Sequence, residues 1–190
     1  MSRARLISTL LAILLVTVAA IAYRLSDQIS DSQLVRAPLD RPTSYESGQV
    51  RVSDVRVATE LREGDDRFPT AGLFVVVHVA VRATARDTVG AASSQLRTAG
   101  GVTYLPTFGS GSGVRALPGF ETARDLVFEV DPARIGGLTL ELWDQGTVYR
   151  YYQRTQTPLG ITPGNAPQWA AAGAGRSVVV VRDDVTTALS

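Results

Sequence analysis

The chain has 190 residues, 45% of them apolar and 19% charged, and a formal net charge of +1 at pH 7. It contains no cysteine, which excludes a disulfide framework, thiolate metal ligands, a cysteine nucleophile and a lipid-modified cysteine. Its cations are scattered rather than clustered, so we expect no nucleic-acid partner. With 17 Gly, 9 Pro and only 7% aromatic residues, the composition favours a turn-rich β domain over a helical bundle.

The first predicted element is a membrane-directed helix. Residues 6–22 are almost entirely apolar, with Arg3 and Arg5 in front of them. As a helix this run spans roughly 26 Å, at the short limit for crossing a hydrocarbon layer of about 30 Å. The arginines keep the N-terminus in the cytoplasm by the positive-inside rule, so the remainder is expected to be extracytoplasmic. We interpret residues 1–24 as a single-pass signal anchor that contacts the cell membrane through residues 6–23.

A cleaved signal peptide is the alternative interpretation of this segment. Ala20-Ile21-Ala22 has the small-x-small pattern that signal peptidase accepts, and cleavage after Ala22 would make the protein secreted. The apolar run exceeds the roughly 7–15 residues of a usual signal-peptide core, however, and ends on Tyr23-Arg24, a pair suited to the membrane interface. Both features favour the uncleaved anchor.

Residues 25–48 are polar and have no strong hydrophobic period. Nothing breaks a helix up to Leu34, whereas Pro38 and Pro42 force an extended backbone. We therefore assign this segment to a juxtamembrane stalk that links the anchor to the domain.

The strand pattern begins at Gln49. Val50 and Val52 share one phase, and the next valines take the other, which predicts a β-bulge at Ser53-Asp54. The run Leu73–Ala83 follows, with no Gly or Pro and five valines, and predicts a strand buried on both faces. The face with Val75, Val77, Val79 and Val81 is assigned to the core. The other face bears Phe74, Val76, His78 and Ala80, and we expect residues 177–181 or the Pro-rich tail to cover it.

Further short strands are predicted at roughly 8–12-residue spacing, with turn residues between them. They are Ser94–Thr98, Val102–Pro106, Glu121–Val130, Leu138–Trp143 and Thr147–Gln153. Gly100-Gly101 and Asp144-Gln145-Gly146 are expected to form hairpin turns, and Pro118-Gly119 closes a loop. In Glu121–Val130 the alternation places Leu126, Phe128 and Val130 inward. About seven such strands predict an all-β fold, an antiparallel β-sandwich over residues 49–154.

The C-terminal part has a different composition. Several Pro and Gly residues and the Ala-rich run 170–175 predict an irregular tail over residues 155–190. Its one strand-like piece is Ser177–Val181, whose four consecutive valines are too apolar to remain exposed. We expect these valines to join a sheet edge, either of this domain or of a partner.

The order of these features resembles a known family. The resemblance is to the small immunoglobulin-like domains of bacterial exported proteins. It rests on the strands at Val50–Val57, Gly72–Val77 and Leu138–Leu142, on the region of Leu96 and Tyr104, and on Pro118-Gly119 shortly before Leu126-Val127-Phe128-Glu129-Val130. Those domains occur in lipoproteins and anchored proteins, chiefly of Gram-positive bacteria, and in a secreted mycobacterial β-sandwich antigen. The resemblance covers residues 49–152 and implies an immunoglobulin-like fold outside the cytoplasm. It implies no shared activity and no catalytic residue.

His78 is the one histidine and the first candidate for chemistry, as a general base or a metal ligand. Its mid-strand position favours a packing or interface role, because catalytic groups more often occupy loops and strand ends. A hydrolase would pair His78 with a serine, and serines cluster at Ser93-Ser94 and within Gly109–Gly113. The second cluster has glycine at its centre, so it is no nucleophile elbow.

Two further groups of side chains could bind something. The acidic turn with Glu60, Glu63, Asp65 and Asp66 offers oxygen ligands for Ca²⁺, although its spacing matches no calcium loop. The densest aromatic group suits contact with a protein partner, because exposed Tyr, Trp and Arg are typical interface anchors. The predicted contact residues are Trp143, Tyr149, Arg150, Tyr151, Tyr152 and Trp169.

Together these features predict a membrane-anchored, extracytoplasmic interaction module that is not an enzyme and uses no cofactor. Its expected partner is a protein of the cell envelope, with this chain as an accessory subunit. Two alternatives remain open: an extracytoplasmic hydrolase that uses His78, and a β-sandwich that binds a small ligand or Ca²⁺.

Overall fold

The computed structural model describes residues 14–18, 32–107, 113–144, 152–175 and 178–189. The chain divides into two compact units, residues 1–32 and residues 33–190. In the first unit, the stretch Leu14–Val18 is helical and its side chains are exposed. Within the described ranges, no helix is long and apolar enough to cross a membrane. Most of the predicted anchor lies outside those ranges, so the anchor stays a prediction.

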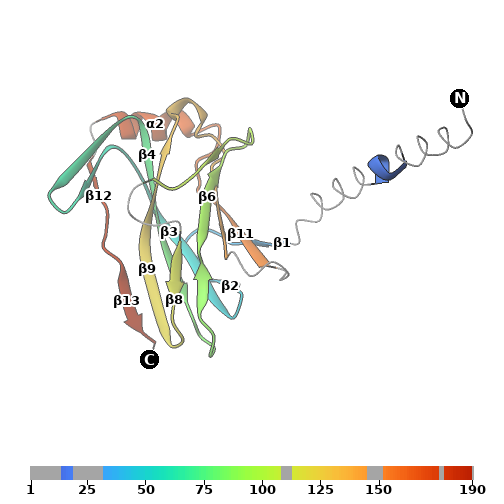
Figure 1. Cartoon of the computed structure of the whole chain (residues 1–190). Coiled ribbons are helices and arrows are strands. Elements are labelled where there is room, and N and C mark those ends of the chain that lie inside the picture. Colours follow the sequence, from blue (N-terminus) through green and yellow to red (C-terminus); the bar gives the residue numbers. More distant parts are fainter. Residues whose placement is uncertain (1–13, 19–31, 108–112, 145–151, 176–177, 190) are drawn as a thin grey trace, which may run out of the picture. The chain divides into compact units, whose positions relative to one another are not determined.

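The second unit is a β-sandwich, which confirms the predicted all-β architecture. Its larger sheet has the strand order β12-β3-β4-β9-β13, with β2 paired to β3. Figure 1 shows β3, β4 and β9 side by side, with the C-terminal strands β12 and β13 beside them. The strands are β2 (Thr43–Tyr45), β3 (Gly48–Glu63), β4 (Asp66–Arg82), β9 (Phe120–Val130), β12 (Val178–Val180) and β13 (Val185–Ala188).

The opposing sheet has the order β1-β11-β10-β6-β7, and a two-stranded sheet pairs β5 with β8. A 3-10 turn, η1 (Pro132–Arg134), leads from β9 towards β10, and the helix α2 (Ala166–Ala174) packs against β3, β4 and η1. The strands are β1 (Ser32–Arg36), β5 (Val89–Ala91), β6 (Ser93–Arg97), β7 (Thr103–Tyr104), β8 (Val114–Ala116), β10 (Thr139–Trp143) and β11 (Tyr152–Pro158).

The main core lies between the two larger sheets. The odd-numbered valines Val75–Val81 of β4 are fully buried there, as predicted, because alternate residues of a strand share one face. Inward-facing residues of β9 and β10, together with Leu138 just before β10, complete this core, which confirms the alternation predicted for Glu121–Val130. They include Leu126, Phe128, Val130, Leu138, Leu140 and Leu142.

A second, smaller core lies on the opposite face of β4. Phe74 and Val76 are buried there against residues of β3 and β9, including Val127. Val179 of β12 packs into this cluster, and Val181 lies against it. The sequence left open whether the valine run joins its own domain or a partner and whether it or the Pro-rich tail covers the far face of β4; the structure shows that it joins the β3 edge of its own domain and that Val179 packs on this face. Its pairing with β3 is parallel.

The predicted turns and the bulge are largely confirmed. The β3–β4 register shifts between Ser53 and Val55, and Asp54 has a φ of 48° at this bulge. Gly101, with a φ of 83°, joins β6 to β7, and Gly119, with a φ of 79°, precedes β9. The register pairs Trp143 with Arg154, and most of the turn predicted at Asp144-Gln145-Gly146 falls on residues that the structure does not describe. Residues 145–151 lie outside the described ranges.

Two predicted segment assignments are wrong. The stalk assigned to residues 25–48 contains β1 and β2, both of which belong to the sandwich sheets. The tail assigned as irregular contains the end of β11, the helix α2 and the strands β12 and β13. The helix forms because Asn165 and Pro167 stand at its start, where proline costs no hydrogen bond, and its Ala-rich sequence has high helix propensity.

Candidate functional site

The strand register places Ser53, His78 and Asp125 in one row across β3, β4 and β9. The row lies on the outer face of the larger sheet, because the neighbouring Val77 and Leu126 face the main core. His78 Nδ1 lies 2.9 Å from Asp125 Oδ1, and the His78 side chain is 18% exposed. The sequence alone could not bring these residues together, since they are far apart along the chain.

Asp125 is the centre of this arrangement, because its side chain is fully buried and meets three donors. Besides its contact with His78, its Oδ2 accepts from Arg56 Nη2 at 2.5 Å and from the backbone N–H of Arg182 at 3.0 Å. Burial raises the pKa of the carboxyl, but the hydrogen bonds from Arg182, His78 and Arg56 outweigh it and hold the pKa below its ordinary value. Asp125 is therefore a buried, paired carboxylate.

The C-terminal strap, defined as residues Val178–Ala188, is tied to this network. It begins on the β3 edge of the sheet and ends on the β9 edge, and Arg182 between them meets the outer-face carboxylate of Asp125. Arg56 Nη1 donates to the carbonyl of Val180 at 3.0 Å. Arg182 also pairs with Asp54. The buried ion pair thus joins three strands to the strap that covers them.

A second ion pair ties the strap to β9 from the side. Arg124 Nε donates to Asp184 Oδ1 at 2.7 Å, and a second nitrogen of the same guanidinium contacts the other oxygen. The pKa of Arg124 is raised by its hydrogen bond to Asp184. A hollow of about 310 Å³ lies between these residues and Glu63.

The chemistry available at His78 is limited by what surrounds it. A histidine oriented by a carboxylate is the core of a hydrolytic triad. Here Arg56 already neutralises that carboxylate, and among the described residues no hydrogen bond joins Ser53 to His78. Ser93 and Ser94 lie on β6 in the other sheet, and residues 108–112 lie outside the described ranges. The arrangement can orient an imidazole and hold the strap.

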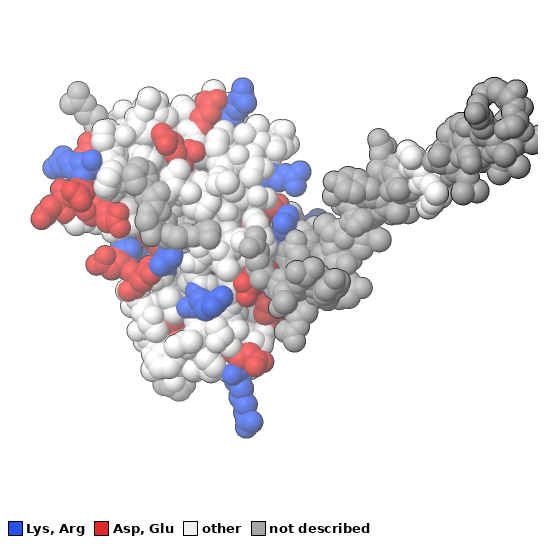
Figure 2. All heavy atoms as spheres, viewed as in Figure 1, with Lys and Arg blue, Asp and Glu red and all other residues white. Residues whose placement is uncertain are grey.

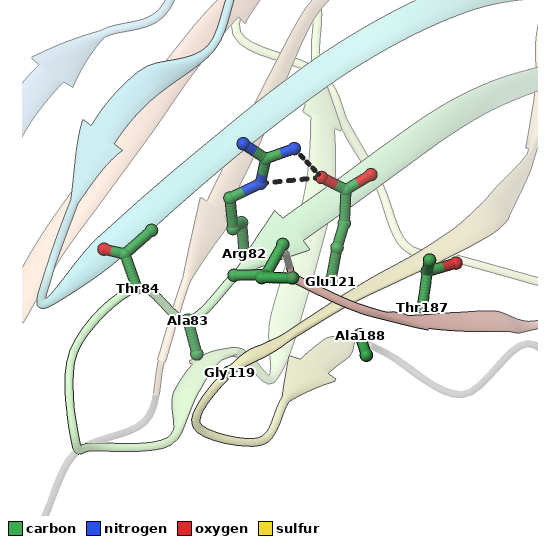
Figure 3. Close-up of a pocket in the computed structure, with 8 residues that line it drawn as sticks. Arg82, Ala83, Thr84, Gly119, Glu121, Thr187 and Ala188 are labelled. Carbon is green, nitrogen blue, oxygen red and sulfur yellow. Dashed lines mark hydrogen bonds and ion pairs between the residues drawn. The ribbon is translucent and has the colours of Figure 1, made fainter.

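The lower end of the same outer face is hollowed. A cavity of about 520 Å³ is lined by the ends of β4, β9 and β13. Figure 3 shows Arg82 and Glu121 paired beside it, with Glu121 Oε2 at 2.9 Å from Nε and 2.8 Å from Nη2 of Arg82. Thr187 and Ala188 of β13 form its opposite side.

Figure 2 shows basic and acidic side chains interspersed over the visible face, without a patch of one sign.

Strand β13 forms one edge of the larger sheet. All four of its residues are exposed, and β9 is its partner in the described sheet order. Val185 is 56% exposed, and Phe120, which pairs with Ala188, is 38% exposed. Leu117, beside the Pro118-Gly119 turn, is 60% exposed. A strand edge with free backbone groups therefore lies beside several exposed apolar side chains.

The predicted contact residues are only partly described. Trp143 ends β10, and the guanidinium carbon of Arg154 lies 4.5 Å from its ring centroid. Trp169 lies in α2 and packs against the main core, so it belongs to a different surface. Tyr149, Arg150 and Tyr151 lie outside the described ranges, and Tyr152 begins β11.

The acidic turn with Glu60, Glu63, Asp65 and Asp66 does not form a cation site among the described residues. Glu60 pairs with Arg67 at 3.1 Å, and the hairpin turns at Gly64-Asp65. No three His, Asp or Glu side chains in the described ranges lie close enough to hold a metal ion together.

Sequence reasoning missed Asp125 and Arg56. Each could have been noticed as a charge at an otherwise apolar strand position, since Asp125 directly precedes Leu126-Val127-Phe128. The residues that contact Asp125 could not have been identified from the sequence, because these contacts depend on the register of three strands and on the path of the strap.

No protein-family model matches the chain, and no curated protein matches it in sequence. Among solved structures it is similar to an uncharacterised β-sandwich protein from Clostridium difficile 630, with 5% identity and a TM-score of 0.44 over 67% of this chain and 95% of that one. It is also similar to the yjhA protein from Bacillus subtilis, with 11% identity and a TM-score of 0.46 over 62% of this chain and 98% of that one.

Proposed function

We propose that this chain is an exported, membrane-anchored, immunoglobulin-like module that binds a protein of the cell envelope and is not an enzyme. The exposed edge of β13 carries this proposal. An unpaired strand edge is a ready template for an extended segment of another chain, and proteins use such edges for strand addition. The apolar run at residues 6–22 supports the location.

The pairing of β13 with β9 shows which backbone groups of β13 would face an added strand. Leu189 donates its N–H to the carbonyl of Gly119, which lies just before β9. Successive N–H groups of a strand point to opposite sides, so those of Val185 and Thr187 also point towards β9. The N–H groups of Thr186 and Ala188 therefore point away from the sheet and are available to an added strand.

The side chains around this edge suit a partner segment with apolar residues. Val185, Phe120 and Leu117 are exposed beside β13. The hollow at Ala188 and Arg82 could receive a side chain of the added strand. Main-chain hydrogen bonds would supply affinity, and these pockets would select the sequence of the partner.

A proline substitution tests the role of the free edge. Thr186→Pro removes the outward N–H, whereas the control Thr186→Val keeps it, and both lose the hydroxyl contact to Thr122 at 3.3 Å. A photo-cross-linking amino acid at Val185, in cells that produce the full chain, should give one dominant protein adduct. We expect this adduct with Thr186→Val and its loss with Thr186→Pro. Equal adducts in both variants, or none in the parent, would refute strand addition at β13.

A hydrolase that uses His78 is the second candidate, and the contact of 2.9 Å between His78 and Asp125 favours it. The two proposals differ in their response to His78→Gln, which keeps a polar side chain at this position. Binding through β13 predicts a retained adduct and a retained cellular phenotype. Loss of the phenotype in a folded His78→Gln protein would favour the hydrolase instead.

A further inference from the structure

The outer face of the five-stranded sheet carries a compact polar surface, which we call the Trp143 face. It consists of Ser93, Gln95, Glu141, Trp143, Arg154 and Gln156. The register places them in two rows, Gln95–Glu141–Gln156 and Ser93–Trp143–Arg154. The rows lie about 7 Å apart, because alternate residues of a strand are separated by two rises of about 3.4 Å. The intervening Leu140 and Leu142 face the core.

Glu141 is unexpectedly buried for an outward-facing residue, with 1% of its side chain exposed. Its oxygens accept from Gln95 Nε2 at 2.6 Å and from Gln156 Nε2 at 2.9 Å, and Arg154 Nη1 lies 3.5 Å away. Each contact uses one N–H of an amide, so a second N–H and a carbonyl oxygen remain on each glutamine. The buried carboxylate therefore holds two amides in fixed orientations on the surface.

Trp143 is fixed in a similar way. The guanidinium of Arg154 lies over its ring at 4.5 Å, an arrangement favoured by the charge distribution of the indole. Arg154 Nε is buried and has no hydrogen-bond partner among the described residues. An aromatic ring held in place thus lies one row from two oriented amides, beside a donor that lacks a partner.

We propose that the Trp143 face binds a neutral oligosaccharide. The charges of Glu141 and Arg154 cancel within the face, and the other four side chains are neutral, so the face offers no net charge to an ionic ligand. A sugar presents apolar C–H groups that pack on an aromatic ring and hydroxyl groups that both donate and accept. Indole and primary amides complement these two features.

A protein partner fits this face less well. Among the described residues, Leu34 on β1 is the one large exposed apolar side chain on a strand next to β11, whereas Leu105, Leu117, Phe120 and Val185 lie elsewhere. None of these five lies on β6, β10 or β11. A protein interface needs apolar anchors at its centre, whereas a sugar site needs one ring and several oriented polar groups. The proposal is independent of strand addition at β13, which belongs to the other sheet.

The two tryptophans of the chain provide the test and its control. In a Trp169→Phe protein, fluorescence reports on Trp143 alone. Purified full-length chain, in a detergent without a sugar headgroup, is titrated with cellohexaose and with chitohexaose up to about 5 mM, a range in which a millimolar Kd is measurable. We expect a saturable change of Trp143 emission with at least one of them. Trp143→Phe, with Trp169 retained, should show no saturable change.

The amides provide a second, independent readout. Gln156→Ala should weaken binding roughly three- to tenfold, as expected for the loss of one or two hydrogen bonds to a neutral ligand. The control Gln168→Ala changes an exposed glutamine of α2, and we expect affinity within twofold of the parent. No saturable change with either oligosaccharide would overturn the proposal. It would also be overturned by equal affinities in Gln156→Ala and Gln168→Ala.

Discussion

Truncation of Asp125 should destabilise the sandwich strongly. Asp125→Ala removes the acceptor shared by Arg56, His78 and the N–H of Arg182. Removal of one partner from a buried ion pair typically costs about 3–5 kcal/mol, because the other charge stays where water reaches it poorly. The Arg56 side chain is 22% exposed, so part of this cost is relieved by solvent and the lower value applies. For a domain of this size, about 3 kcal/mol lowers the thermal midpoint by roughly 6–12 °C.

Asp125→Asn separates the charge of this residue from its hydrogen bonds. An amide oxygen in the place of Oδ2 still accepts from Arg56 and Arg182, and the NH₂ group takes the place of Oδ1. It can then donate to His78 Nδ1 if the imidazole carries its proton on Nε2. The variant keeps the hydrogen-bond pattern and loses only the ionic part, so we expect a cost of about 1–2 kcal/mol.

Urea unfolding of residues 33–190, followed by circular dichroism between pH 3 and pH 7, measures both effects. The pKa of Asp125 is lower in the folded chain than its ordinary value of 3.8. The associated stability is complete above about pH 4 and is lost as pH falls through the folded pKa. Asp125→Asn should therefore lose less stability below pH 4 than the parent. An exposed carboxyl, changed in Asp87→Asn, is the control. A cost under about 1 kcal/mol for Asp125→Ala, or equal costs for the alanine and asparagine variants, would contradict the role of this carboxylate.

Two further substitutions test the packing of the C-terminal part. Gly173→Ala would place a Cβ 2.1 Å from Leu73 Cδ1, so we expect a loss of about 1–3 kcal/mol in urea unfolding, whereas Gly164→Ala meets no close atom and should be neutral. Val179→Asp puts a charge into the second core and should cost several kcal/mol, whereas the same change at the exposed neighbour Val178 should cost under about 1 kcal/mol. Equal losses at the two valines would contradict the packing of the strap.

The sequence predicted those parts of the fold that depend on the alternation of apolar residues along one strand. The alternation in Leu73–Val81 gave the strand and its core face, since side chains on one face of a strand recur every second residue. The bulge at Asp54 was visible as a change of phase. The helix α2 was missed because the Pro and Gly residues in and around it were weighed more heavily than its alanines, although Pro167 at a helix start is favourable.

The candidate sites depend on long-range register, which local pattern does not contain. Glu141 reads as an ordinary outward residue of an alternating strand, and its burial comes from Gln95 and Gln156 on the neighbouring strands. His78 was correctly expected to lie on a covered face. Its partner Asp125 was not identified, because three strands can be aligned in many ways before the hairpins and bulges are known.

The position of the strap explains why a buried charged network lies beside the second core. Val179 and Val181 cover Phe74 and Val76, but the strap must then leave β3 and reach β9. Along this crossing the backbone of the strap lies over the sheet rather than at its edge. Its N–H and C=O groups there cannot form the hydrogen bonds that join neighbouring strands. The carboxylate of Asp125 supplies an acceptor for one N–H there. Burial of that carboxylate in turn requires a cation and a donor from the sheet. The histidine is then part of the support for a crossing strand, and this role is sufficient to account for its place in the fold.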